Sequence, residues 1–144
     1  MRTIAHQRGV GSHNRADCFV QTLTNTLCIP YSQSIELASA YDWKASKGIS
    51  PNKTYDCLKK QGASAIVLGF SLCARAMHLH CKPLDFEYRG TSPTLAAWLA
   101  TPEAQKGCFA VCIRGHIFAV INGTVYDARS NPARSKIYAI YKLN

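Results

Sequence analysis

The sequence lacks any long hydrophobic run. No apolar stretch approaches the roughly 20 residues that a membrane-spanning helix needs, and the first residues carry no apolar signal segment. Charged residues are also few, at 17% of the 144, whereas hydrophobic residues make up 47%, which excludes a disordered chain. We therefore expect a soluble, cytoplasmic protein that does not act in a membrane.

Acidic residues are scarce as well. Eight Asp and Glu stand against 17 Lys and Arg, which gives a formal net charge of +9. Such an excess favours an acidic partner: nucleic acid, an anionic membrane or an acidic protein surface. The basic residues are scattered, however, and no basic run exceeds Lys59-Lys60. A generally basic surface explains the same numbers, so charge alone assigns no function.

The seven cysteines are an odd number without a secretion signal, which favours reduced thiols over a disulfide framework. The chain suits one domain by length, and it contains no linker, repeat or low-complexity tract. We expect residues 1–13 to form a loose N-terminal arm and residues 14–144 to form a single domain.

The pattern of apolar residues and caps predicts helices first and strands last. Apolar side chains recur at helical spacing after the N-cap residue Asp17 and stop before Pro30. Further helices are expected at 32–45, from Ser50-Pro51 to Gly62, and after Ser92-Pro93. Short apolar or alternating runs predict strands at 108–113, 117–121, 124–126 and 136–141, with 65–69 as a candidate strand in the poorly patterned stretch 64–91.

Asn122-Gly123 is a strong signal for a two-residue hairpin turn and places Ile121 opposite Thr124. Helices followed by antiparallel strands define an α+β class. We expect N-terminal helices that pack on a C-terminal antiparallel sheet of three to five strands.

Three residues carry the chemistry. Cys18 lies at the start of the first predicted helix, where free backbone N–H groups and the helix dipole favour a thiolate and face a developing oxyanion. The hairpin register brings His116 near Asp127, although it leaves open which way their side chains point. Each has an ordinary structural interpretation too: a small buried thiol, a core histidine and a strand-end acid. Together they predict a nucleophile, a general base and a carboxylate that orients it.

The order of these residues resembles papain-like cysteine peptidases, with the cysteine on a helix and the His and Asp on a later sheet. The stretch 94–99, Lys106-Gly107, Gly115-His116 and Asp127 is similar to the bacteriocin-processing branch. Residues 14–20, with an Asp-Cys pair, resemble small papain-fold proteins of bacteriophages, as do 48–62, the turn 119–123 and the tyrosine-rich basic end.

The resemblance implies a papain-like fold and a cysteine-dependent acyl-transfer enzyme of the peptidase, isopeptidase or amidase type. It implies a phage-encoded protein that acts on a host or virion protein or peptide, without a metal or organic cofactor. Two departures from the bacteriocin-processing pattern stand out: Ser12 replaces a Gln that donates to the oxyanion, and Ala128 replaces the Pro after Asp127. Asn14 is our candidate for the missing donor, and whether water or an amine accepts the acyl group is open.

Two alternatives belong to other classes. One is a catalytically idle papain-fold protein whose basic surface inhibits a host factor, such as a defence protein or a nucleic-acid enzyme. The other is a zinc-stabilised nucleic-acid module built on Cys73, His78, His80 and Cys81, although their crowded spacing is unlike two separated ligand pairs. The substrate and the oligomeric state have no signature in the sequence.

Overall fold

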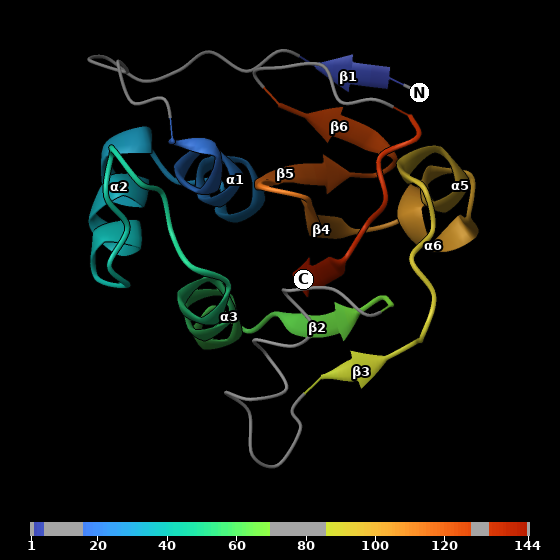
Figure 1. The fold of residues 1–144 in the computed structure, drawn as a ribbon. Helices are drawn as coiled ribbons and strands as arrows, with labels where there is room; N and C mark the ends of the chain where they lie inside the picture. Colours follow the sequence, from blue (N-terminus) through green and yellow to red (C-terminus); the bar gives the residue numbers. More distant parts are fainter. Residues whose placement is uncertain (1, 5–15, 70–85, 128–132, 144) are drawn as a thin grey trace.

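The computed structural model describes residues 2–4, 16–69, 86–127 and 133–143. Within these ranges the chain has an α+β fold, in which helices flank a mixed sheet of seven strands in the order β1-β6-β5-β4-β7-β2-β3 (Figure 1). The α+β class predicted from the sequence is therefore confirmed. No helix in these ranges is both long and apolar enough to cross a bilayer.

The helices lie on the two faces of the sheet (Figure 1). On one face lie α1 (Cys18–Leu27), α2 (Tyr31–Ser39) and α3 (Pro51–Lys60). On the other face lie the short helices α5 (Leu95–Leu99) and α6 (Pro102–Gln105). The sheet thus separates two apolar layers, and its central strands contribute side chains to both.

The middle of the sheet is antiparallel and its edges are parallel. Strand β4 pairs antiparallel with β5 and β7, while β6 pairs antiparallel with β5, and β2 with β7. At the edges, β1 runs parallel to β6 and β3 runs parallel to β2. The strand bounds are β1 Arg2–Ile4, β2 Ser64–Val67, β3 Glu87–Tyr88, β4 Cys108–Ile113, β5 His116–Ile121, β6 Thr124–Tyr126 and β7 Ala139–Leu143.

The expectation of an antiparallel sheet of three to five strands was wrong in both respects. Arg2–Ile4, part of the predicted loose arm, form β1 and pair with β6. At the opposite edge, Glu87–Tyr88 form β3 and pair with β2. Both edge strands are very short, and strands of two or three residues show no periodicity that a sequence could reveal. Parallel strands also cannot be joined by a tight turn, so no turn motif in the sequence predicts their pairing.

Two helix boundaries also differ from the prediction. The second helix ends at Ser39 because the chain turns there, with Asp42 at a positive φ of 65° and the Trp43 N–H donating to the Ala38 carbonyl. The fourth helix is capped by Thr94 rather than by Ser92. The Ser92 hydroxyl instead donates to the Leu68 carbonyl at 2.7 Å.

The two hairpins that frame β5 follow tight registers. Ile121 pairs with Thr124, as Asn122-Gly123 predicted. At the other end of β5, Ile113 pairs with His116, so Arg114 and Gly115 form a second two-residue turn. Gly115 has a φ of 68°, a conformation that glycine adopts without strain. These registers place the start of β5 and the end of β6 at the same end of the sheet.

Candidate active site

Cys18 is the first residue of α1, and buried apolar side chains of the same helix pack it against the sheet. Phe19, Val20 and Leu23 are fully buried in the layer between α1–α3 and the sheet. Three threonines of α1 donate their hydroxyls to carbonyls one turn back, including Thr22 to the Cys18 carbonyl at 2.8 Å. The helix contacts β5 along the sheet, so the strand that carries His116 lies next to it.

His116 and Asp127 meet at one end of the sheet. His116 is the first residue of β5, and Asp127 directly follows β6, its antiparallel neighbour. His116 Nε2 lies 2.6 Å from Asp127 Oδ2, and the two side chains are only 7% and 6% exposed. The side chains thus point toward one another, which answers the question of orientation that the sequence left open.

Cys18 belongs to the same cluster, because the His116 side chain acts on its thiol. Burial opposes ionisation of the Cys18 thiol. The hydrogen bonds from the His116 side chain and from the main chain of Ile117 and Phe19, together with the charge on His116, outweigh burial and lower the pKa of Cys18 below its usual value. The Phe19 contribution is the helix N-terminus acting on the sulfur, as the position of Cys18 in the sequence predicted.

The His116 imidazole is shifted in the complementary direction. Burial alone would lower its pKa, but the hydrogen bonds to Asp127 and Cys18 and the negative charges of both groups raise the pKa of His116 above its usual value. A thiol with a lowered pKa beside an imidazole with a raised one favours the thiolate–imidazolium pair. Since Nε2 is engaged by Asp127, Nδ1 is the ring nitrogen left for the sulfur.

Asp17, the residue before Cys18, has a role that its position did not predict. It occupies the N-cap position of α1, but its side chain makes no capping hydrogen bond. Its carboxylate is 1% exposed and accepts hydrogen bonds from Tyr31 Oη and Gln21 Nε2, both at 2.8 Å. The start of α1 is thereby tied to the first residue of α2.

A second contact fixes the backbone just before Asp17. The indole N–H of Trp43 donates to the Ala16 carbonyl at 2.9 Å. Gly48 packs close to the same residue, since a Cβ placed there would lie 3.6 Å from Ala16 Cβ. The loop between α2 and α3 therefore supports the segment that leads into Cys18, and no motif in the sequence could have revealed this contact.

Several predicted residues lie outside the described ranges. Asn14, the candidate oxyanion donor, is one of them, as is Ser12. The possible zinc ligands Cys73, His78, His80 and Cys81 also fall outside. Among the residues that are described, no group of three or more His, Cys, Asp or Glu side chains is arranged to hold a metal ion.

The geometry therefore brings together the three residues singled out from the sequence: a thiol at a helix N-terminus, an imidazole and a carboxylate. Comparisons of this chain with family models, with curated proteins and with solved structures found no match.

Proposed function

We propose that this protein is a cysteine-dependent acyl-transfer enzyme with Cys18 as nucleophile, His116 as general acid and base, and Asp127 as the residue that orients the imidazole. The observation that supports this most directly is the continuous chain of contacts from Cys18 through His116 to the buried Asp127 carboxylate. Burial of three ionisable groups together costs free energy, because each of them loses water. Clusters of ionisable groups with shifted pKa values are therefore typical of functional sites.

The chemistry follows from the positions of the protons. The Cys18 thiolate attacks the carbonyl carbon of an amide, and the main-chain N–H groups at the start of α1 face the oxygen that gains charge. The His116 imidazolium then gives its proton to the leaving amine, and a thioester with Cys18 remains. Water or an amine attacks this thioester, His116 takes the proton of the attacking group, and Cys18 leaves as the thiolate, which restores the thiolate–imidazolium pair. Asp127 keeps the ring nitrogen Nδ1 aimed at the sulfur throughout.

The papain-like arrangement, the action on a host or virion protein and the phage origin are further parts of this proposal. They rest on the resemblance in residues 14–20, 94–99 and 115–127 and on the chain order of helix cysteine, strand histidine and strand-end aspartate. The structure supplies a compatible order of elements, since α1 precedes the sheet that carries the other two groups.

The first experiment is the pH dependence of iodoacetamide alkylation at Cys18, followed by peptide mass in the parent protein and in His116→Ala. Because His116 lowers the pKa of Cys18, we expect a lower alkylation midpoint in the parent than in the variant. Removal of the imidazole should reduce the alkylation rate at pH 6.5 by about tenfold or more.

The chain contains its own references for this measurement. Cys28 is exposed and lies just beyond the opposite end of α1, so it reports a thiol with no helix N-terminus beside it. Cys57 is buried, which raises the pKa of its thiol to about 12, and it should stay unmodified in the folded protein. A Cys18 that labels no faster than Cys28, with a midpoint that ignores His116, would refute the enzyme and favour the binding protein instead.

A further inference from the structure

Three exposed cations of the described residues lie on the two loops that lead to the candidate site. Lys44 and Lys47 belong to the turn that follows Trp43, the residue whose indole holds the Ala16 carbonyl. Arg114 lies in the two-residue turn between β4 and β5, two positions before His116. All three side chains are exposed. The first loop thus contacts Ala16, two residues before Cys18, and the second leads directly into His116.

Within the described ranges, no ion pair involves Lys44, Lys47 or Arg114. Asp42, the acid of the same loop, is engaged by Lys53 at 3.4 Å. The acids closest to the thiol, Asp17 and Asp127, are buried and hydrogen-bonded. On these two described loops, three exposed cations stand against the single acid Asp42, so their exposed charge is positive.

We propose that the segment which binds at Cys18 is an acidic stretch of polypeptide, with Asp or Glu side chains close to the attacked amide and held by Lys44, Lys47 and Arg114. This inference rests on the proposed acyl-transfer function, which requires an amide substrate and so favours a polypeptide over a nucleic acid. Unpaired cations at the rim of a site attract oppositely charged partners and raise the rate of encounter more than they raise the affinity.

The inference can be tested without knowing the substrate, because two alkylating agents of similar size differ in charge. Iodoacetate is an anion and iodoacetamide is neutral, so the ratio of their rates at Cys18 reports the electrostatic potential at the sulfur. We expect Lys47→Glu and Arg114→Glu each to reduce the iodoacetate-to-iodoacetamide ratio by about two- to fivefold at low salt, and less at high salt.

Lys106→Glu is the matched control. Lys106 is exposed and precedes β4, whereas Arg114 follows the same strand, so the six residues of β4 separate them by about 20 Å, which is beyond the screening length of about 10 Å at 0.1 M salt. The ratio should not change in this variant. Equal ratios in the parent, Lys47→Glu and Arg114→Glu would overturn the inference, whereas the iodoacetamide rate alone would still report whether Cys18 is an activated thiolate.

A second readout identifies the class of partner. A glutamate-rich peptide should protect Cys18 from iodoacetamide in the parent, and protection should weaken at least threefold in the variant that combines Lys47→Glu with Arg114→Glu. Protection by a single-stranded oligonucleotide of equal charge, without protection by the peptide, would overturn the polypeptide assignment. Protection by neither polyanion would overturn it as well.

Discussion

Asp127 illustrates what a single residue contributes to the site. It lies one position beyond β6, 5% exposed, with its Oδ2 2.6 Å from His116. The carboxylate raises the pKa of His116 against the opposite effect of burial. Because the folded pKa exceeds the unfolded one, the stabilisation from this pair is fully present below pH about 6.5 and is lost as the pH rises through the folded pKa of His116.

This sign gives a prediction for Asp127→Asn. We compare Cys18→Ser alone with Cys18→Ser combined with Asp127→Asn, so that the thiol does not contribute its own titration. At pH 5.5 the asparagine should lower the free energy of unfolding by about 1–3 kcal/mol, because a hydrogen bond between two charged groups is lost. At pH 9 the loss should be clearly smaller. Urea titrations at the two pH values measure both, and an equal loss at each pH would contradict the ion pair.

The residues of the site were found from the sequence to different degrees. Cys18, His116 and Asp127 could be identified from the sequence because the start of a helix, the start of a strand and the register of a hairpin are encoded by nearby residues. The supporting contacts could not be identified in this way, because Trp43 lies 27 residues along the chain from Ala16 and Tyr31 lies 14 residues from Asp17. Such contacts depend on how α2 packs beside α1, which no short-range pattern encodes.

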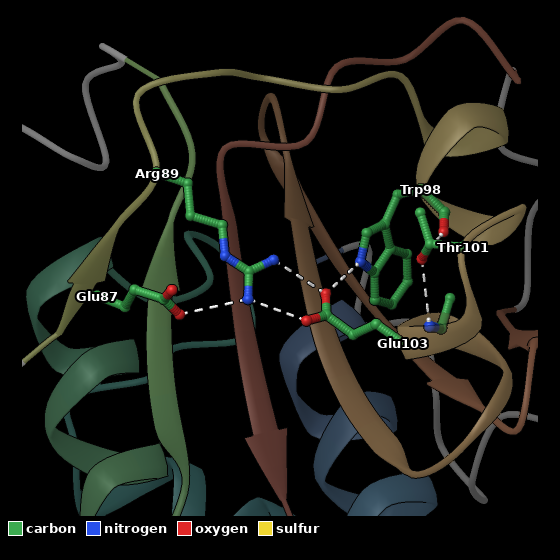
Figure 2. Close-up of polar contacts among 6 residues, drawn as sticks. Glu87, Arg89, Trp98, Thr101 and Glu103 are labelled. Carbon is green, nitrogen blue, oxygen red and sulfur yellow. Dashed lines mark hydrogen bonds and ion pairs between the residues drawn. The ribbon is translucent and has the colours of Figure 1, made fainter.

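Strand β3 and helices α5 and α6 show the same distinction for elements. The caps of the short helices are local, with Thr94 and Thr101 accepting from main-chain N–H groups three residues ahead. The attachment of β3 is not local, because Arg89 beyond the strand binds both carboxylate oxygens of Glu103 on α6, at 3.1 and 2.9 Å (Figure 2). Glu87 Oε2 lies 3.3 Å from the same guanidinium. Hydrogen bonds to Glu103 and Glu87 raise the pKa of Arg89.

Glu103 also accepts a hydrogen bond from the Trp98 indole at 2.9 Å (Figure 2). We therefore predict unequal effects of two substitutions. Arg89→Ala removes a pair whose side chains are 35% and 32% exposed, so water screens it, and the free energy of unfolding should fall by less than about 1 kcal/mol. Glu103→Ala also leaves the buried indole N–H without its acceptor and should cost about 1–3 kcal/mol.

Glu103→Gln separates the two contributions, because an amide oxygen can still accept from the indole. Urea unfolding at pH 7 should rank the variants with Glu103→Ala the least stable and the other two closer to the parent. The hydrogen bonds from Arg89 lower the pKa of Glu103. The stabilisation of the fold by this pair is therefore present above pH about 4.5 and is lost as the pH falls through the folded pKa of Glu103. If Arg89→Ala lowered the free energy of unfolding more than the other two substitutions, the hydrogen bond from the Trp98 indole would not be the main stabilising contact of Glu103.

The whole molecule is built from two apolar layers that share one sheet. The layer beneath α1–α3 contains Trp43, and the layer beneath α5 and α6 contains Trp98, which packs edge-on against Phe109 at 5.1 Å. Strand β4 faces both layers, since Ala110 and Cys112 belong to the first and Phe109 and Val111 to the second. If the sheet opens, each layer loses the strand side chains that its helices pack against.

Because the sheet is shared, we predict that both layers unfold in one transition. The chain has only two tryptophans, one in each layer, so Trp98→Phe and Trp43→Phe each leave a single fluorescent reporter of one layer. In each variant, the urea midpoint from fluorescence should coincide with the midpoint from far-ultraviolet circular dichroism. A fluorescence midpoint that departs from the circular dichroism in one variant would show that its layer melts separately.

Strand β7 lies in the interior of the sheet, between β4 and β2, although it comes last in chain order (Figure 1). During synthesis, the strands on its two sides are therefore present before the strand that joins them. Cys18 leaves the ribosome long before His116, Asp127 and β7. A nascent chain would therefore carry the Cys18 thiol without His116 or Asp127 beside it until residues 116–127 have been made, so the contacts that lower the pKa of this thiol arise only after that point.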